Sequence, residues 1–331
     1  MYIILMANNI NVKKLLWDEE LTNSRLELNI NGKDIDNVII NTLRRISITD
    51  IPIYAFTNIN ITENTSIFNN NYLKLRLNNL TVLGIKSKTH IFKSSENKDI
   101  FIEEDNSLIN MDDINLSIKK DNINISTLDK LTMYLNFENK TDEIISIGTN
   151  DCNFYLKEKQ IKSPYPMNIQ LIKLQPKQKI VFSAITELGI EKLSSIFSPV
   201  SIFTFIEKSN DNYNLILESR GQLNEKEILD VCNSNIQNQL DNIEKLIPDD
   251  DSLEGKLVLK KIDHTLGNIL SSGLKRHDKV IYAGYNMPHP LDDKIIIHFK
   301  LKEGKIKSTI KDTIKYYKKI FNDLNEKIKL I

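Results

Sequence analysis

The side chains best suited to chemistry are five histidines, two cysteines and a run of three aspartates, and none of them forms a known catalytic or metal-binding pattern. No HExxH pair, GxxxxGK[ST] or GxSxG sequence is present, and no histidine has a cysteine at ligand spacing. Cys152 and Cys232 are too few for a four-cysteine zinc site or a disulfide framework. The run Asp249 to Asp251 is better explained as a helix end and linker than as a metal site. We therefore expect no catalytic residue, no cofactor and no metal. The histidines are His90, His264, His277, His289 and His298.

The bulk composition narrows the class of protein. The chain has 331 residues, which predicts about two domains, and its 44 basic residues balance its 44 acidic ones. A freestanding nucleic-acid binder usually has a basic excess, because phosphate neutralisation supplies most of its affinity. The lysine-rich stretch 311–319 is interleaved with apolar residues at helical spacing, which indicates a solvated helix face. Direct binding of DNA or RNA is therefore not expected.

The sequence also predicts where the protein works. The apolar run Met1 to Met6 is shorter than the roughly 7–15-residue core of a signal peptide. No stretch approaches the roughly 18–20 apolar residues of a membrane span. The scarcity of cysteine is typical of a reducing compartment. We expect an intracellular protein with no membrane contact.

The first part of the chain predicts a strand, a helix and a second strand. Leu26 to Ile30 alternates apolar and polar residues, which indicates a strand, and Asn31-Gly32 marks a turn. A helix is predicted from Asp36, a good N-cap, to Ser47, and it should end before Pro52. A strand is predicted from Ile53 to Ile61. The apolar face of the helix comprises Val38, Ile39, Leu43 and Ile46.

The middle of the chain is polar and strand-like. We predict an inserted β-rich subdomain at 84–170, in which Leu131 to Phe137 alternates well. Strands at Ile172–Ala184 and Val200–Phe205 are then predicted to return to the first domain.

Two long helices are predicted, one on each side of a linker at 248–252. The first begins with a capping-box pattern, Asn224 and Glu227, and the second begins near Ser308. Each carries a seam of apolar residues at alternating steps of three and four, the pattern of a helix that packs lengthwise on another helix. Both seams span about 20 residues, or roughly 30 Å, so we expect the helices to pair. The seams are Leu229, Cys232, Ile236, Leu240, Ile243 and Ile247, and Ile310, Ile314, Tyr317, Phe321, Leu324 and Ile328.

One unit occurs twice in this pattern. The first part of the chain has a strand, then Ile35-Asp36, then a helix and a strand. The same order occurs after residue 250, with Ile262-Asp263 in place of Ile35-Asp36. The predicted strands of the second copy are Lys256–Lys260, Val280–Tyr285 and Lys294–Phe299. Spacing alone leaves two interpretations open. In the first, the copies are related modules that bury both seams against each other. In the second, they are the repeated strand–helix–strand units that any α+β protein shows.

Two motifs favour related modules. Asn41-Thr42-Leu43-Arg44-Arg45-Ile46, followed by Asp50-Ile51-Pro52, resembles the N-x-L-R-R…(E/D)-(V/I)-P signature of α-like RNA polymerase subunits. That family contains bacterial α, archaeal D and the eukaryotic third subunit. The stretch 263–270, DHTLGNIL, with Ala283-Gly284-Tyr285 and Pro288-His289-Pro290-Leu291, is similar to the signature of the eleventh subunit and archaeal L.

Weaker similarity to the third subunit lies between the two motifs. Arg76-Leu77 looks like part of its H-R-L-G segment, and Ser198-Pro199-Val200 like the end of its W-S-P-V stretch, with Phe197 where Trp is usual. Glu218-Ser219 and Gly221 look like its V-E-S-x-G strand. The resemblance implies a third-subunit-like module at 1–83 plus 171–247, with 84–170 as a poorly matching insert. It implies an eleventh-subunit-like module at 253–331.

The resemblance implies an α+β fold in which two α-like dimerisation modules form an intramolecular pseudo-heterodimer. In the family, the N-x-L-R-R helix packs against the helix after D-H-T-L-G-N, and long terminal helices complete the interface. Leu43 and Ile46 would then pack against Leu266 and Leu270, and Gly267 would allow close approach because it has no Cβ. The other interface residues expected are Asn41, His264, Thr265, Leu240, Ile243, Tyr317, Phe321 and Leu324.

Arg44 and Arg45 need a separate account, because adjacent helix residues cannot both face the core. We assign both to an interface with a large polymerase subunit. One could instead pair within the heterodimer while the other reaches a carboxylate or carbonyl of the large subunit. Two solvated arginines are the alternative.

The resemblance implies a non-catalytic assembly platform of a DNA-directed RNA polymerase that nucleates binding of the second-largest and largest subunits. Small subunits resembling the tenth and twelfth would be further partners, and DNA or RNA would be reached only through the complex. A standalone nucleic-acid-binding or regulatory protein on the same fold is the alternative.

The sequence departs from the family in two ways. Many third subunits carry a cysteine cluster in the insert, but this insert holds only Cys152, so no zinc or iron–sulfur site is expected. The modules are continuous, and such fusions resemble those of large DNA viruses. This implies the host cytoplasm and virion as the location, or otherwise the nucleus.

Overall fold

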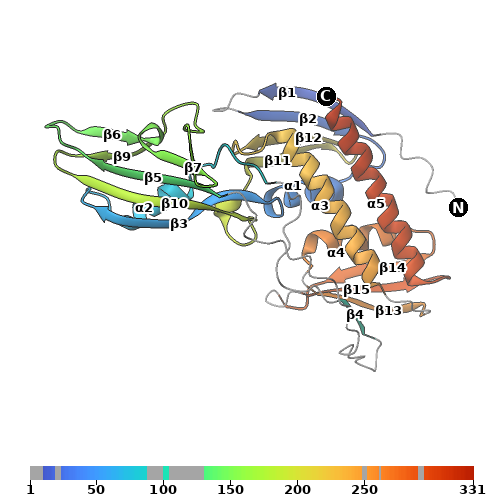
Figure 1. Cartoon of the computed structure of the whole chain (residues 1–331). Helices are drawn as coiled ribbons and strands as arrows, with labels where there is room; N and C mark the ends of the chain where they lie inside the picture. The colour runs from blue at the N-terminus through green and yellow to red at the C-terminus, as the bar shows by residue number, and fades with distance from the viewer. Residues whose placement is uncertain are drawn as a thin grey trace.

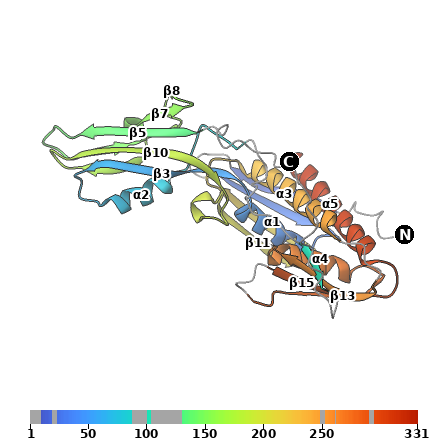
Figure 2. The same ribbon diagram turned by 60° about the horizontal axis from the view of Figure 1, so that its bottom comes forward.

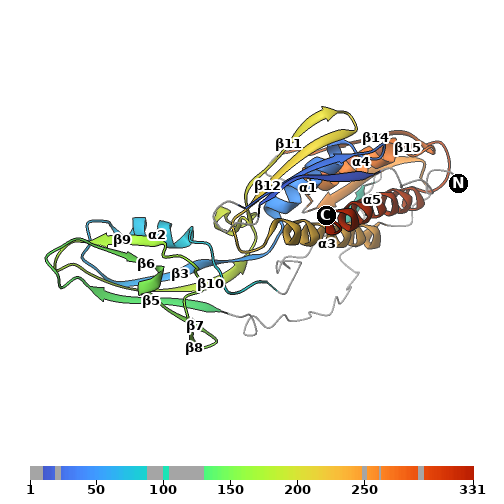
Figure 3. The same cartoon turned by 90° about the horizontal axis from the view of Figure 1, so that it is seen from above.

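The chain folds around two separate hydrophobic cores. The computed structural model describes residues 10–18, 24–87, 100–103, 130–247, 252–260, 262–289 and 294–331. We call the part built on the larger core the helical domain, because it contains all the long helices. The part built on the smaller core, between positions 54 and 188, is the distal domain. Figure 3 shows the two domains end to end.

The helical domain contains two four-stranded sheets with the same strand order. The first runs β1 (Asn11–Asp18), β2 (Arg25–Asn31), β12 (Asn212–Ser219) and β11 (Val200–Ser209). The second runs β4 (Ile100–Glu103), β13 (Glu254–Lys260), β15 (Lys294–Leu301) and β14 (Val280–Asn286). All neighbouring strands are antiparallel. Along the chain, the second strand in each order (β2 or β13) is followed by a helix. The third strand (β12 or β15) is followed by a longer helix.

Four helices join the sheets. The shorter ones are α1 (Asn37–Thr49) and α4 (His264–Lys275), and the longer ones are α3 (Glu225–Leu246) and α5 (Ile306–Lys329). The predicted N-cap Asp36 and the predicted capping box of Asn224 and Glu227 are both formed. Helix α5 begins two residues before the predicted start at Ser308. Figure 1 shows α3 and α5 side by side, running from one sheet to the other across α1 and α4.

The two long helices pack along each other in opposite directions. Near the start of α3, Asp230 accepts a hydrogen bond of 2.8 Å from Asn325 near the end of α5. Near the end of α3, Glu244 lies 3.6 Å from Lys311 near the start of α5. The seam residues predicted from the spacing of three and four are all buried. The predicted pairing of the two helices is therefore confirmed.

The distal domain is built mainly from strands. A five-stranded sheet has the order β3 (Ile53–Asn64), β10 (Lys179–Gly189), β5 (Leu131–Glu138), β7 (Asn153–Leu156) and β8 (Lys159–Ile161). A separate pair is formed by β6 (Ile145–Gly148) and β9 (Gln170–Leu174). Helix α2 (Asn70–Asn78) packs on β3 and β9, and Figure 2 shows it on this domain, away from α1, α3, α4 and α5. Single 3₁₀ turns occur at Thr149–Asp151 and Ser195–Phe197.

The limits of the distal domain differ from the predicted insert 84–170. Its core includes residues from Tyr54 to Ile85 and extends to Ala184, because β3 and β10 pair with each other along their length. The strands predicted at Ile172–Ala184 are β9 and the start of β10, and they belong to this domain rather than to the first. The segment Val200–Phe205, in β11, belongs to the helical domain, as predicted. Strand β4 also belongs there, although it lies within the predicted insert, because it pairs with β13. Residues 88–99 and 104–129 lie outside the described residues.

The repeated unit contains a different strand after the helix from the one predicted. The strand after α1, β3, belongs to the distal domain, whereas the strand after α4, β14, remains in its own sheet. The counterpart of β14 is β11, which follows after the whole distal domain. Sequence order hides this correspondence because the distal domain lies between α1 and β11.

A short turn after β12 joins the two domains. The buried side chain of Gln222 accepts a hydrogen bond from Tyr54 N at 2.8 Å and donates to Tyr54 O at 3.1 Å and Val82 O at 2.8 Å. Gly221 has φ +96°, a conformation that favours glycine. The stretch resembling V-E-S-x-G is therefore the segment that fixes the distal domain to the helical domain.

Candidate interface of α1 and α4

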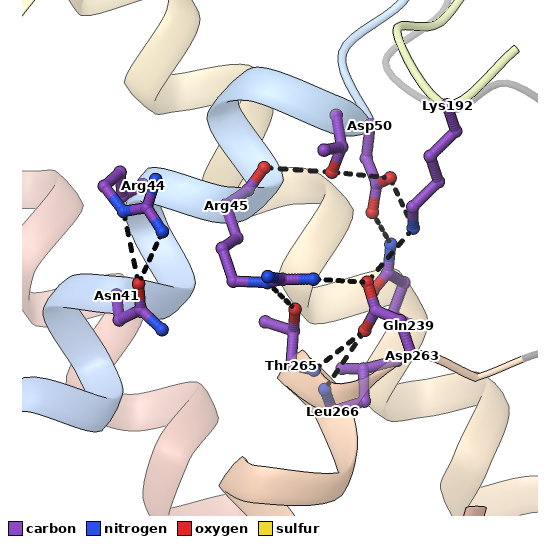
Figure 4. Close-up of polar contacts among 10 residues, drawn as sticks. Asn41, Arg44, Arg45, Asp50, Lys192, Gln239, Asp263, Thr265 and Leu266 are labelled. Carbon is purple, nitrogen blue, oxygen red and sulfur yellow. Dashed lines mark hydrogen bonds and ion pairs between the residues drawn. The ribbon is translucent and has the colours of Figure 1, made fainter. Parts of the chain in front are cut away.

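The N-cap carboxylate of α4 has two roles, one in its own helix and one across the interface. Asp263 Oδ1 accepts hydrogen bonds from the backbone N of Thr265 at 3.0 Å and of Leu266 at 3.4 Å. Its Oδ2 lies 3.8 Å from Arg45 Nη2 on α1 and 3.5 Å from Lys192 Nζ, after β10 (Figure 4). Arg45 Nε also donates to Thr265 Oγ1 at 2.6 Å. The start of α4 is therefore bound to the second half of α1.

The N-cap carboxylate of α1 repeats this arrangement. Asp36 Oδ1 accepts a hydrogen bond from Ile39 N at 2.9 Å, and its Oδ2 accepts one from Arg276 at the C-terminus of α4. The hydroxyl of Tyr316 on α5 donates to Asp34 Oδ1 at 3.1 Å. Helices α1 and α4 thus run in opposite directions. The N-cap aspartate of each helix contacts an arginine in the C-terminal half of the other helix.

The C-terminus of α1 is held by a third group of contacts. Asp50, whose side chain is 8% exposed, pairs with Lys192 at 2.6 Å and accepts a hydrogen bond from Gln239 of α3 at 2.8 Å (Figure 4). Asn235 of α3 donates to the backbone oxygen of Asp50 at 3.0 Å. Lys192 therefore links the carboxylates at the end of α1 and the start of α4.

The charges of this cluster shift the pKa values of its members. Burial alone would raise the pKa of Asp263, but Lys192, Arg45 and the hydrogen bonds from Thr265 outweigh it and hold the pKa below its usual value. Burial alone would lower the pKa of Lys192, but Asp50 and Asp263 outweigh it and raise the pKa. Both groups therefore stay charged at neutral pH.

Substituting Asp263 separates its charge from its capping role. Asp263→Asn keeps an N-cap acceptor and should lower the free energy of unfolding by about 1 kcal/mol at pH 7. Because the folded-state pKa is depressed, the charge stabilises the fold above the unfolded pKa of about 4, and this contribution is lost as the pH falls through the folded-state value. Urea unfolding at pH 7 and pH 3 should therefore show a larger difference between wild type and variant at pH 7 than at pH 3. An equal difference at both pH values would contradict the assigned role of the charge.

The structure brings together most of the predicted interface residues. Helices α1 and α4 pack on each other, and α3 packs on α5. Asn41, by contrast, is only partly buried and accepts hydrogen bonds from Arg44 through Oδ1, at 3.2 and 2.9 Å. The predicted residues that are buried in these helices are Leu43, Ile46, Thr265, Leu266, Leu270, Leu240, Ile243, Tyr317, Phe321 and Leu324.

Two predicted residues have other neighbours. A Cβ added to Gly267 would lie 2.9 Å from Ile295 and 3.0 Å from Tyr285, so this glycine allows close packing of α4 on its own sheet rather than on α1. His264 is exposed, and its ring packs edge-on against Tyr285 of the same sheet, with centroids 5.9 Å apart. Helical spacing shows which residues share a face, but not which element covers that face.

The two arginines have different surroundings. Arg45 contacts Thr265 and Asp263 within the chain, so its assignment to a large-subunit interface is corrected to a contact inside this interface. Arg44 bonds to Asn41 one turn before it on the same helix (Figure 4). Arg44 alone is retained for the large-subunit role.

Sequence reasoning missed Arg276, Asp50 and Lys192 as interface residues. The signal for Arg276 was its place at the end of α4, where a cation suits the C-terminal end of a helix dipole. Lys192 lies in an irregular segment between β10 and β11, and no spacing pattern marks it.

The buried cysteines show no reactive chemistry. Cys152 and Cys232 are free thiols, and burial raises the pKa of each to about 12. A thiol with such a pKa is neither a good nucleophile nor a ready metal ligand. Among the described residues, no three His, Cys, Asp or Glu side chains are grouped as a metal site would need. In the same part of the chain, no helix combines the length and apolar character needed to cross a membrane.

Comparison with known proteins shows what this chain is similar to. Residues 254–327 match the RNA polymerase Rpb3/Rpb11 dimerisation domain. An alignment of 331 positions, covering 94% of this chain and 92% of the relative, gives 28% identity to a protein of Acanthamoeba polyphaga mimivirus assigned as DNA-directed RNA polymerase subunit R470. Residues 254–327 are thus similar to a dimerisation domain of RNA polymerase subunits, and nearly the whole chain is similar to a viral RNA polymerase subunit. The alignment to the viral relative runs through both halves of this chain.

Other relatives match only short parts of this chain. The Caenorhabditis briggsae protein assigned as subunit RPAC2 of RNA polymerases I and III is 48% identical over 48 residues, 14% of this chain and 33% of the relative. The DNA-directed RNA polymerase subunit Rpo11 of Saccharolobus solfataricus is 44% identical over 59 residues, 18% of this chain and 61% of the relative. These two matches cover less than two thirds of the relatives, so they describe a shared part and not a whole protein.

Proposed function

We propose that this chain is the non-catalytic assembly platform of a DNA-directed RNA polymerase, in which two modules pair within one polypeptide. The supporting observation is the reciprocal contact of α1 and α4, in which each N-cap aspartate meets an arginine of the other helix. The equal strand order of the two sheets supports a pair of related modules. Pairing within one chain raises the effective concentration of each module for the other and removes an association step.

The partners proposed are the second-largest and largest polymerase subunits, together with small subunits resembling the tenth and twelfth. Nucleic acid would be reached only through the complex, since the chain has no net charge. A standalone nucleic-acid-binding role has no observation in its favour. The place of work would be the host cytoplasm and virion for a viral chain, and otherwise the nucleus.

Arg44 is the residue proposed to reach a large subunit. It is half-buried, it bonds only locally to Asn41 among the contacts described, and it lies beside Arg45, which binds α4. A planar guanidinium with several donors suits a carboxylate or a carbonyl group of a partner.

Arg44→Ala should therefore impair assembly without unfolding the chain. We expect the free energy of unfolding to change by less than about 0.5 kcal/mol, because no buried contact is lost. Recovery of the two large subunits with the tagged variant, from the virus or cell that encodes the chain, should fall at least about tenfold. Quantitative mass spectrometry of the purified complex measures this ratio.

The matched control is Lys315→Ala, on the exposed side of α5. It removes one cation, as Arg44→Ala does, and should leave recovery unchanged. Normal recovery with Arg44→Ala would remove the role proposed for this arginine. Absence of the wild-type chain from the purified polymerase would overturn the proposed function itself.

The third-subunit-like module is proposed at 1–83 plus 171–247, of which β3, α2, β9 and β10 fold with the distal domain, and the eleventh-subunit-like module is proposed at 253–331. The linker is proposed at 248–252, of which 248–251 lie outside the described residues. Pro290 and Leu291 of the second motif also lie outside them.

Cutting the proposed linker tests whether the two halves form an internal heterodimer. A protease site replacing Asp249 to Asp251 should allow cleavage between the halves of the folded full-length chain. Because α1 packs on α4 and α3 on α5, the cut halves should still elute as one species in gel filtration at micromolar concentration. Separation of the halves under native conditions would contradict the internal heterodimer.

A further inference from the structure

Helix α2 and the turn before it expose a row of large apolar side chains. Leu73 and Leu77 of α2 are fully buried in the distal core, as expected for the inner face of a surface helix. The outer face carries polar residues, but large apolar side chains lie among them. Its large apolar residues, with their exposed fractions, are Ile67 (68%), Phe68 (40%), Tyr72 (38%) and Leu75 (60%). These four side chains are close together in the sequence and are more exposed than large apolar residues usually are, so this surface is suited to be covered by a partner.

The side chains of this row are held in place before any partner arrives. The rings of Phe68 and Tyr72 stack with centroids 4.5 Å apart and planes at 18°. The guanidinium of Arg76 lies 5.9 Å from the Tyr72 ring centroid and donates to Gln170 O at 2.8 Å. In the preceding turn, Asn64 donates to Phe68 O at 2.9 Å. Such fixed aromatic and arginine side chains lose little entropy on binding, and they are enriched among residues that dominate binding energy.

The charged residues of α2 itself are all basic. Lys74 and Arg76 are exposed on α2, and no aspartate or glutamate occurs from Asn64 to Ser87. A covering surface would therefore be favoured if it carried carboxylates beside its apolar residues.

We propose that the surface formed by Ile67, Phe68, Tyr72, Leu75 and Arg76 docks another subunit of the polymerase, one that presents apolar side chains flanked by aspartate or glutamate. This proposal rests on the proposed function and adds a second contact surface to it. The surface lies on the distal domain, away from helices α1 and α4 (Figures 1 and 2).

Hydroxyl-radical footprinting of the full chain, free and within the purified polymerase, tests the proposal. We expect the peptide containing residues 67–76 to be oxidised at least about fivefold more slowly in the polymerase than in the free chain. An equal oxidation rate in both samples overturns the proposal. If the chain is absent from the purified polymerase, the proposed function fails and this proposal fails with it, so the two failures are distinguishable.

A charged substitution identifies the occupant. Leu75→Asp places a carboxylate on a surface that would meet carboxylates, and it should lower recovery of one polymerase subunit at least about tenfold while the others are retained. Leu75 is 60% exposed, so circular dichroism should show an unchanged fold. The control is Ile281→Asp, because Ile281 is 57% exposed on β14 of the other domain and should leave recovery of that subunit unchanged. Full recovery of every subunit with Leu75→Asp overturns the proposal. Protection of the surface by a second copy of this chain also overturns it. A photo-crosslink from position 75 that joins two copies of the chain would detect that outcome.

Discussion

Replacing Phe321 by alanine is expected to lower the free energy of unfolding by about 4 kcal/mol. Phe321 is 1% exposed in the seam of α5, with its ring centroid 6.5 Å from that of Tyr317. Helices α3 and α5 are antiparallel partners along their whole length, so the cavity left by the ring would lie between two rigid elements that cannot easily close it. The loss should therefore be near the upper end of the usual range for a buried phenylalanine.

The two domains require a measurement that separates them, because each has its own core and unfolding need not be a single transition. Trp17 is the one tryptophan of the sequence and packs against the core of the helical domain, with Lys226 Nζ 3.9 Å from its ring centroid. Its fluorescence in urea should show the helical domain unfolding at lower denaturant in Phe321→Ala than in wild type.

The matched control for Phe321→Ala is Lys315→Ala, an exposed position on the same helix, which should change stability by less than about 0.5 kcal/mol. A loss below about 1 kcal/mol for Phe321→Ala would show that the seam does not carry the stability of the helical domain.

The helices of the helical domain could be predicted from the sequence because their signals are local. The N-caps Asp36 and Asp263 and the capping box at Asn224 mark helix starts, and the steps of three and four mark buried faces. These signals need no knowledge of the rest of the chain. The paired seams also followed, since two apolar stripes of equal length have few other places to be buried.

Other elements gave weak or misleading signals. Strand β1 was not predicted, because the run Lys13-Lys14-Leu15-Leu16 does not alternate and the strand contains an irregularity between Lys14 and Leu16. Helix α2 was not predicted either, because its apolar residues lie on both sides and only Leu73 and Leu77 are buried.

The spacing of apolar residues does not show which distant elements a strand or helix packs against. The alternation in β9 and β10 predicts strands but does not say which sheet they join, and both belong to the distal domain. Gly267 was placed on the correct helix but given the wrong neighbour, because an added Cβ would meet Ile295 and Tyr285 of its own sheet. The sequence motif located the α1–α4 interface, while the charged contacts of Lys192 and Arg276 became visible only in the folded chain.

The second large effect is expected at Gly273, where α4 meets α5 at short distance. An added Cβ would lie 2.3 Å from Thr313 Cγ2 and 2.6 Å from the ring of Tyr317, closer than such contacts occur in folded proteins. Gly273→Ala should therefore lower the free energy of unfolding by about 2 kcal/mol, although alanine favours an isolated helix by about 1 kcal/mol over glycine. The Tyr317 ring is fully buried and cannot swing aside, so the helices must separate.

Removing the opposing methyl group tests this steric explanation. Thr313→Ser deletes Cγ2 and keeps the hydroxyl that donates to Thr309 O at 2.9 Å. In a double-mutant cycle followed by Trp17 fluorescence in urea, Thr313→Ser should recover about half of the loss caused by Gly273→Ala. Gly267→Ala is the matched control. Its added Cβ would lie 2.9 Å from Ile295 Cδ1 and 3.0 Å from the ring of the half-buried Tyr285, farther than the contacts at Gly273, so its loss should be smaller. Equal losses at the two glycines, without recovery by Thr313→Ser, would mean that the close approach of α4 and α5 does not limit stability.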